Sequence, residues 1–275
     1  ATTDANGAYY FSSATATNTA NAKYGLNIEA FSAYTITVAT NQAPLNGFNL
    51  TTANAPQPAG GNTPVTNNSP ITDVADSDGA LSGINAIIPY TTAGPGANNH
   101  GLDFGFFAPA SLGDYVWEDV NHNGQQDDGN TGINGVAVAL LNSSGNVVST
   151  TTTFTGGPSN IAGYYTFTNL ISDTYRVSIT LPSGYVATYP NSGVDATDSD
   201  GIADGVFAVS GAYVLNAGES NPTVDFGLFA PNPAIKLIKY TNGEDADVPT
   251  GPIVALNSTV TWTYRITNTG NVTLT

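Results

Sequence analysis

The sequence predicts an all-β protein made of β-sandwiches in tandem. Thr, Val, Tyr and Phe, which favour strands, are frequent, whereas helix-forming residues other than Ala are scarce. Short segments in which apolar and polar residues alternate are separated by Gly, Pro, Asn and Ser, and the 275 residues include 30 Gly and 16 Pro. One stretch of sequence also occurs twice along the chain.

The clearest strand signals lie in the middle of the chain. Six segments combine strand-forming residues with alternating polarity, and turn residues bound each of them. Six or seven short strands within about 120 residues are typical of a β-sandwich. The predicted strands are 113–117, 135–141, 147–154, 163–170, 174–180 and 223–229.

The repeat sets the predicted domain boundaries. The segment ITDVADSDGALSG at 71–83 matches GVDATDSDGIADG at 193–205, and LDFGFFAP at 102–109 matches VDFGLFAP at 224–231. The first copy begins at NGAYYF, which resembles AGYYTF of the second copy, and so lacks counterparts of 110–160. We therefore predict a partial sandwich at 1–108, a complete one at 109–231 and the first strands of a further domain at 232–275.

Composition excludes several classes of function. Asp and Glu total 21 against 5 Lys and Arg, a formal net charge of -16, which argues against binding of nucleic acid or of an anionic membrane surface. No run of 18 apolar residues exists, so no membrane insertion is expected. The absence of Cys removes disulfides and thiolate metal sites. Because Met is also absent, we expect the chain to derive from a longer protein.

Enzymatic activity is not predicted. A Ser-His-Asp triad would need His100 or His122, and no G-x-S-x-G motif is present. A hydrolase with paired carboxylates is conceivable, but the acids lie in Gly- and Asn-rich loops at metal-ligand spacing.

One acidic loop has the spacing of a calcium site. In DVNHNGQQDDGN (119–130), oxygen ligands stand at positions 1, 3, 5 and 9, a backbone carbonyl at 7 and Gly at 6. Asn130 stands at position 12, where a bidentate Glu is usual, so Asp128 could serve instead. The alternative is an Asx-rich turn without an ion. The candidate Ca²⁺ ligands are Asp119, Asn121, Asn123, Gln125 (through its carbonyl), Asp127 and Asp128.

The repeated segment supplies a second set of candidate ligands. Each copy places three carboxylates within six residues and a further Asp at the start of the DFG strand. Solvated loop acids are the alternative interpretation. Calcium suits these oxygen clusters better than magnesium, which keeps most of its waters. The candidates are Asp195, Asp198, Asp200 and Asp225 in the second copy, and Asp73, Asp76, Asp78 and Asp103 in the first.

Together, these motifs resemble the B-repeat of staphylococcal serine-aspartate-repeat adhesins, the SdrD B-like domain. The resemblance rests on the G-D-Y-V-W strand, the D-x-N-x-N-G loop, the G-Y-Y-T-F-T-N-L strand and the D-S-D segment, fully over 110–230 and in part over 1–108. It implies tandem Ig-like, collagen-adhesin-B-like β-sandwiches that bind calcium and act as stiff spacers. Residues 235–275 resemble the start of an Ig-like repeat of prokaryotic surface proteins.

We therefore predict a calcium-stabilised structural segment of an extracellular prokaryotic surface protein, located at the cell surface or cell wall. Its expected partners are neighbouring copies of itself, in a fibre, sheath or stalk, or flanking repeats of the same chain. Two alternatives stay open. One is a spacer of a long cell-wall adhesin whose ligand-binding head lies elsewhere, and the other is a carbohydrate-binding module.

Overall fold

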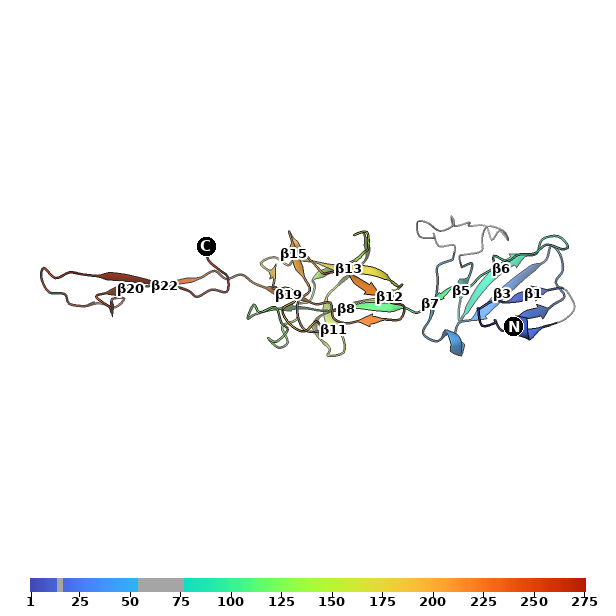
Figure 1. Cartoon of the computed structure of the whole chain (residues 1–275), viewed down its shortest axis with the longest axis horizontal. Coiled ribbons are helices and arrows are strands. Elements are labelled where there is room, and N and C mark those ends of the chain that lie inside the picture. Colours follow the sequence, from blue (N-terminus) through green and yellow to red (C-terminus); the bar gives the residue numbers. More distant parts are fainter. Residues whose placement is uncertain (14–16, 54–76) are drawn as a thin grey trace. The chain divides into compact units, whose positions relative to one another are not determined.

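The chain divides into two units, Ala1–Ala108 (unit 1) and Pro109–Thr275 (unit 2). The computed structural model describes residues 1–13, 17–53 and 77–275 (Figure 1). Nearly all of the regular structure is strand, which confirms the predicted all-β fold class. The three-domain division remains a prediction.

Unit 2 contains two sheets that enclose its core. One has the order β10-β9-β13-β16-β15, and β17 also pairs with β13. The other has the order β11-β12-β8-β19-β14, and β18 also pairs with β8. Their strands are β8 (Ala110–Glu118), β9 (Ala137–Asn142), β10 (Val147–Thr152), β11 (Phe154–Gly156), β12 (Ile161–Leu170), β13 (Asp173–Thr180), β14 (Val186–Ala187), β15 (Ile202–Asp204), β16 (Phe207–Val209), β17 (Tyr213–Leu215), β18 (Ser220–Asn221) and β19 (Phe226–Phe229).

Each of the six predicted strands corresponds to a strand of unit 2, with small shifts at the ends. The short strands β14 to β18 were not predicted, because two or three residues are too few to show an alternating pattern. In Figure 1, β13 and β15 lie on one side of the sandwich and β8 and β11 on the other. The strand β8 is central, since it pairs with β12 in antiparallel and with β19 in parallel orientation.

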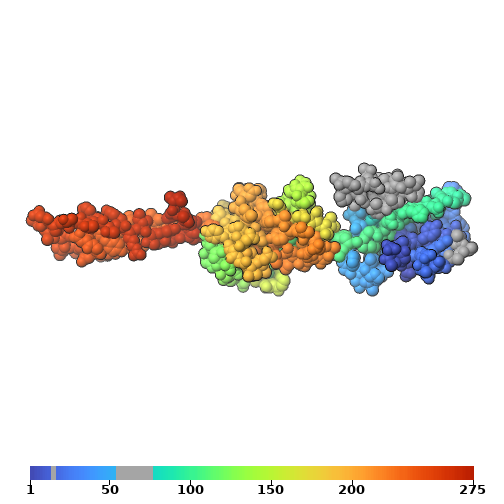
Figure 2. All heavy atoms as spheres, in the orientation of Figure 1, coloured from blue at the N-terminus to red at the C-terminus, as the bar shows by residue number. Residues whose placement is uncertain are grey.

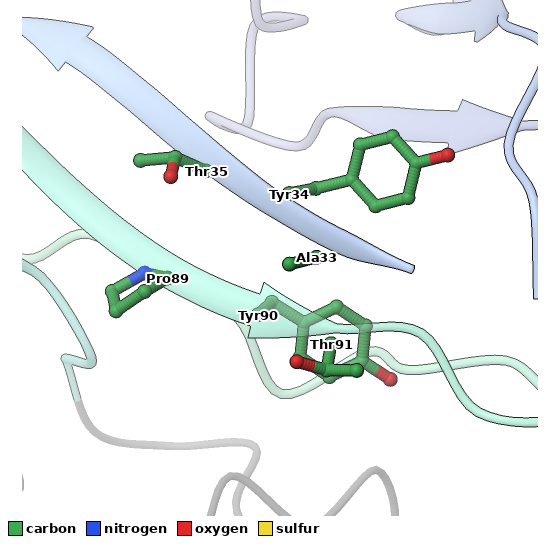
Figure 3. Close-up of a pocket in the computed structure, with 6 residues that line it drawn as sticks. All are labelled: Ala33, Tyr34, Thr35, Pro89, Tyr90 and Thr91. Carbon is green, nitrogen blue, oxygen red and sulfur yellow. The ribbon is translucent and has the colours of Figure 1, made fainter. Parts of the chain in front are cut away.

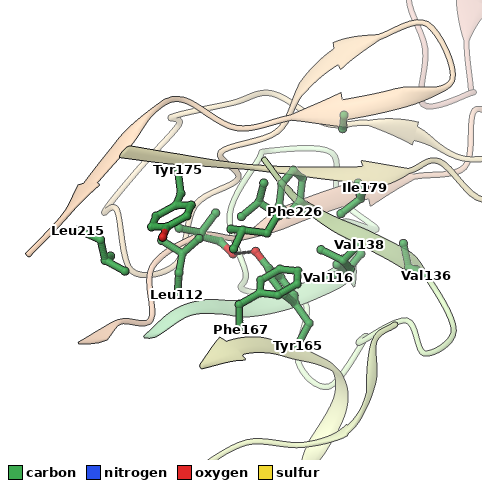
Figure 4. Close-up of a cluster of buried hydrophobic side chains, with 14 of the residues drawn as sticks. Leu112, Val116, Val136, Val138, Tyr165, Phe167, Tyr175, Ile179, Leu215 and Phe226 are labelled. Carbon is green, nitrogen blue, oxygen red and sulfur yellow. Dashed lines mark hydrogen bonds between the residues drawn. The ribbon is translucent and has the colours of Figure 1, made fainter. Parts of the chain in front are cut away.

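The core of unit 2 lies between the sheets (Figure 4). Inward-facing residues alternate along the strands, as in Val138 and Leu140 of β9 or Val177 and Ile179 of β13. All four of these side chains are at most 1% exposed. Burial of this apolar area is the main term that stabilises the sandwich, which has no disulfides.

The hydroxyl of Tyr165 should contribute measurably to this core. It is fully buried and donates to the carbonyl of Val224 at 2.5 Å. We expect Tyr165→Phe to lower the unfolding free energy by about 1–3 kcal/mol, because the carbonyl loses its partner. Tyr164→Phe, at a half-buried position of the same strand, is the matched control. Equal denaturation midpoints for both variants would contradict the expectation.

In its described residues, unit 1 has fewer strands than unit 2, and they form three small sheets. The orders are β3-β6-β5, β1-β2 and β4-β7. Two short 3₁₀ helices lie between these strands. The elements are β1 (Tyr10–Ser12), η1 (Thr19–Asn21), β2 (Lys23–Gly25), β3 (Ala33–Ala39), η2 (Ala43–Leu45), β4 (Asn49–Leu50), β5 (Ala80–Ser82), β6 (Asn85–Thr91) and β7 (Phe106–Phe107).

The C-terminal part of unit 2 is a three-stranded sheet of order β21-β20-β22, with β20 (Ile235–Thr241), β21 (Glu244–Asp245) and β22 (Trp262–Asn268). Register places Leu237 opposite Ile266, so that both share one face with Trp262 and Tyr264. These four side chains are more than half exposed. Figure 2 shows the C-terminal part of the chain in orange to red. No residue from 235 to 275 is buried, and this sheet has no core of its own.

Among the described residues, no helix is long and apolar enough to cross a membrane.

Candidate calcium sites

Asp119 anchors the loop that follows β8. Its fully buried carboxylate accepts the N–H groups of Asn123 at 3.1 Å and Gly124 at 2.8 Å, and the hydroxyl of Thr188. Gly124 has a φ of 79°, and a Cβ there would lie 2.4 Å from the carbonyl oxygen of Tyr189. The sharp turn at loop position 6 therefore requires Gly.

The next candidate ligands converge on one carboxylate. The amide nitrogens of Asn121 and Asn123 each donate to an oxygen of Asp127 at 2.9 Å. The amide oxygens accept N–H groups two residues further on, from Asn123 at 3.1 Å and from Gln125 at 2.7 Å. These are Asx turns, which curl the loop inward. Four of the six predicted loop ligands (Asp119, Asn121, Asn123 and Asp127) thus belong to one hydrogen-bonded loop.

The remaining two loop candidates have other contacts. The carbonyl of Gln125 accepts the N–H of Asp127 at 2.9 Å. Asp128 accepts the N–H groups of Val120 at 2.8 Å and Asn121 at 3.3 Å, so it braces the beginning of the loop. Asn130 is exposed.

His122 lies in the same loop. Its ring stacks on Phe229, with centroids 3.6 Å apart, and on Tyr189 at 4.6 Å. Its Nδ1 lies 3.3 Å from the carbonyl oxygen of Asn271, which follows β22. The side chain of Asn271 in turn donates to the carbonyl of Ala230 at 2.8 Å. The loop is therefore in contact with the segment that follows β22.

Asp200 and Asp225 form a reciprocal pair beside β19. Asp200 donates its N–H to the Asp225 carbonyl at 2.8 Å, and Asp225 donates its own to the Asp200 carboxylate at 2.7 Å. The second Asp200 oxygen accepts the hydroxyl of Tyr213 at 2.6 Å. One Asp225 oxygen accepts the N–H of Tyr115 at 3.1 Å, whereas its buried Oδ2 has no hydrogen-bond partner.

Burial makes these carboxylates hard to ionise. Desolvation raises the pKa of Asp225 to about 9, and the negative charge of Asp114 adds to this effect. Desolvation also raises the pKa values of Asp200 and Asp114 to about 6. Arg176 is the one Lys or Arg in the sequence between 110 and 228. These carboxyl groups therefore have few basic side chains to offset their charge when they ionise.

The remaining two candidates of this copy differ in burial. Asp198 is 3% exposed and accepts the N–H of Gly193 at 2.8 Å, while its Oδ1 has no hydrogen-bond partner. Asp195 is exposed. The N–H of Ser199 donates to the Gly124 carbonyl at 3.1 Å, which brings this segment against the loop of Asp119. Sequence spacing did not indicate that the two groups adjoin.

Unit 1 repeats part of this arrangement. Asp78 donates its N–H to the Asp103 carbonyl at 2.8 Å, and Asp103 donates its own to the Asp78 carboxylate at 2.8 Å. The preceding serines also match, since Ser77 accepts the N–H of Gly105 at 3.0 Å and Ser199 that of Gly227 at 3.0 Å. The other two candidates, Asp73 and Asp76, lie outside the described residues.

In the described part of the chain, no three Asp, Glu or His side chains gather closely enough to hold a metal ion by themselves. Any site must therefore include amide or backbone oxygens, which calcium accepts as ligands. The loop of Asp119 offers both. The buried oxygens of Asp198 and Asp225 that lack partners also fit a cation better than they fit an apolar surrounding.

Three residues at these sites were not predicted. Asp114 adds charge beside Asp225, Thr188 donates to Asp119, and Tyr213 donates to Asp200. Asp114 could have been found, because an acid within the G-D-Y-V-W strand is unusual in a sandwich core. Thr188 and Tyr213 carry no signal in the sequence, since hydroxyl residues are abundant in the chain.

Comparison with known proteins identifies the central domain. The family model of the SdrD B-like domain matches residues 110–228, the span from β8 to β19. Residues 110–228 are an SdrD B-like domain. The chain is also 38% identical over 186 residues to serine-aspartate repeat-containing protein F of Staphylococcus epidermidis. It is 39% identical over 150 residues to serine-aspartate repeat-containing protein D of Staphylococcus aureus strain Newman.

These matches cover 67% and 54% of the chain, but only 9% and 10% of the two relatives. The chain thus aligns with about a tenth of the length of the relatives it matches. Homology to the serine-aspartate repeat proteins supports the predicted extracellular location at the cell surface or cell wall. Neither relative is named for an enzymatic activity.

Proposed function

We propose that this chain is a structural segment of a longer adhesin at a prokaryotic cell surface, stiffened by calcium. The observation that carries the proposal is the SdrD B-like domain with its oxygen-rich loop after β8. The relatives are named for their repeats, and a spacer repeat with flanking repeats in the same polypeptide fits that context. An adhesive head, if present, would lie outside this segment.

Calcium would be held in unit 2 at two adjoining places. Asp119, Asn121, Asn123, the Gln125 carbonyl and Asp127 would supply ligands in the loop, with Asp128 bracing its start. Asp195, Asp198, Asp200 and Asp225 would supply ligands beside β19, together with amide or backbone oxygens. Both sets consist of oxygen donors, which suits a hard cation. The ion would neutralise charge that has no basic partner nearby.

The energetic effect follows from mass action. An ion that binds only the folded state adds about 2.7 kcal/mol per site at 100 times its dissociation constant. Such a gain is comparable to that of a native disulfide, and this chain has no Cys. Calcium would therefore stabilise a small sandwich outside the cell, where disulfides would otherwise be expected.

Unit 1 is proposed to be a second, related repeat. The Asp78–Asp103 and Ser77–Gly105 contacts have the same pattern as their counterparts 122 residues later. Gly79 and Gly201 also match, since a Cβ on either would lie 2.6 Å from a ring atom of the following DFG phenylalanine. Asp73, Asp76, Asp78 and Asp103 remain the proposed ligands of this copy.

Assembly into a fibre or sheath is the second candidate function. The apolar face of β20 and β22 favours it, because Leu237, Trp262, Tyr264 and Ile266 are more than half exposed there. Exposed apolar patches of this kind mark contacts with further protein. Homology to the repeat proteins favours the spacer of a longer adhesin over this candidate.

Asp119→Ala tests the calcium proposal. We expect the wild-type protein to bind calcium in titration calorimetry and to melt several degrees higher with calcium than with a chelator. The variant should lose at least one bound ion and much of the difference between the two melting temperatures. Asp173→Ala, at an exposed position of β13, is the matched control. A wild-type melting temperature unchanged by chelation, with no bound metal in native mass spectrometry, would refute the proposal.

A further inference from the structure

The strands at the ends of the two sheets of unit 2 differ in length. In the order of each sheet, the end strands are β10 and β15 in one and β11 and β14 in the other. The strand β10 has six residues, whereas β11 and β15 have three each and β14 has two. Very short edge strands offer little main chain to a further strand, and proteins use them to avoid pairing at sheet edges. Of these four edges, β10 is the one long enough to pair.

The sequence of β10 also lacks the residues that usually block pairing at an edge. It reads Val-Val-Ser-Thr-Thr-Thr, without Lys, Pro or an acid, and every residue except Ser149 is β-branched. The register on β9 shifts once, between Val147 and Ser149, and is regular from there to Thr152. By contrast, β6 of unit 1 carries Pro89 beside Tyr90 in a hollow (Figure 3), and Pro has no N–H to donate to a further strand.

Part of the main chain of β10 faces away from the sandwich. An antiparallel strand bonds its neighbour through alternate residues, so the other N–H and C=O groups of β10 point away from β9. In the part of the chain that the structure describes, residues 147–152 have no hydrogen bond beyond the ladder with β9. Val147 and Val148 are also more than half exposed. The edge thus offers both main-chain groups and apolar surface to another strand.

The strands at this side of the sandwich carry no charged residue. No Asp, Glu, Lys, Arg or His occurs between Asp128 and Asp173, a span that contains β9 to β12. These four strands are the outer two of each sheet at this side, and only Thr153 separates β10 from β11 along the chain. The opposite edge of the first sheet, β15, carries Asp204. The long edge is therefore also the uncharged one.

We propose that β10 pairs with β10 of a second copy of this chain, antiparallel about a twofold axis, so that one sheet continues through both copies. The charge pattern favours a second copy as the partner. Chains with a formal net charge of -16 repel one another, and the repulsion is weakest where the facing sides carry no charge. A basic partner would instead be attracted to the acidic loop of Asp119. Self-pairing also places β-branched residues opposite one another, which stabilises paired strands.

This contact goes beyond the proposed spacer function, because it joins separate chains. It requires neither calcium nor the exposed face of β20 and β22. In each copy β10 keeps its pairing with β9, so neither core has to open. Salt should strengthen the contact, since it screens the repulsion between the acidic copies.

Thr150→Lys tests the contact in the full chain. We expect the wild type to form dimers in sedimentation velocity, increasingly with protein concentration and with salt, in calcium and in chelator alike. Thr150 is exposed, and the substitution brings a Lys of each copy into the contact, so dimerisation should weaken by about tenfold or more. Ala203→Lys, at an exposed position of β15, changes the net charge equally and should dimerise like the wild type.

Single cysteines provide a second measurement, because the chain has no Cys of its own. Ser149→Cys, Thr150→Cys, Thr151→Cys and Thr152→Cys are oxidised in turn. At least one should form a disulfide-linked dimer, since residues near a twofold axis face their own counterparts. Ala203→Cys should remain unlinked.

A chain that stays monomeric at every concentration and salt would overturn the proposal. So would dimers that persist in Thr150→Lys, and their loss in Trp262→Lys would then place the contact on the C-terminal sheet. Absence of a disulfide at all four positions would also contradict pairing through β10. Calcium binding is measured separately by calorimetry, so its failure is distinguishable from failure of this contact.

Discussion

Replacing Asp225 with Asn is expected to stabilise the metal-free protein and to destabilise the calcium-loaded one. The carboxylate is fully buried, one oxygen lacks a hydrogen-bond partner, and burial raises its pKa to about 9. At neutral pH, the metal-free fold must therefore keep this group protonated or bury its charge. Both cost free energy relative to the unfolded chain, where the carboxyl ionises freely.

Asn has nearly the same shape and no charge, so the cost disappears without calcium. We expect a gain on the order of a few kcal/mol at pH 7. With calcium present, the variant lacks one negative ligand and should melt below the wild type. Denaturation of the wild type and the variant, with calcium and with chelator, measures whether their order of stability reverses. Asp204→Asn, at an exposed position of β15, is the control. Curves that shift in the same direction under both conditions would contradict a ligand role for Asp225.

Phe226→Ala is expected to be the most damaging single change in unit 2. The ring is fully buried in the core and packs beside Tyr165, with centroids 6.3 Å apart. Loss of a buried Phe side chain costs about 3–5 kcal/mol through lost burial and the cavity left behind. The fluorescence of Trp117, which lies in the same sandwich, can follow the transition.

The matched change in unit 1 is Phe104→Ala. Because Phe104 is only half-buried, the loss there should be smaller. Both Trp residues lie in unit 2, so hydrogen exchange of β3 and β6 has to report on unit 1. Equal losses for the two substitutions would mean that the core of unit 1 is as complete as that of unit 2.

Much of the fold could be predicted because its signals are local. Alternation along 163–170 and 174–180 indicated β12 and β13, and Gly, Asn and Pro marked where strands end. The Asp119 loop was also readable, since Asx turns and a Gly at position 6 depend on residues only a few positions apart. The DFG strand and its partner acids could be placed because the chain contains the pattern twice.

Other features depend on contacts between distant parts of the chain. Thr188 reaches Asp119 across 69 residues, and Tyr213 reaches Asp200 from a three-residue strand that is too short to show an alternating pattern. The contact of the segment around Asp198 with the loop of Asp119 also comes from the packing of the two sheets. Nothing in the local sequence distinguishes these residues from the many other Thr, Tyr and Asp residues.

The sequence by itself determined that the protein is all-β, that one of its segments is repeated, and that most of its 21 acids lie in clusters. These properties follow from residue type and from spacing along the chain. Only the tertiary structure decided which acids are buried and which buried oxygens lack partners. Burial and pairing depend on neighbours brought together by the fold, and for Asp225 those neighbours, Tyr115 and Asp200, come from distant parts of the chain.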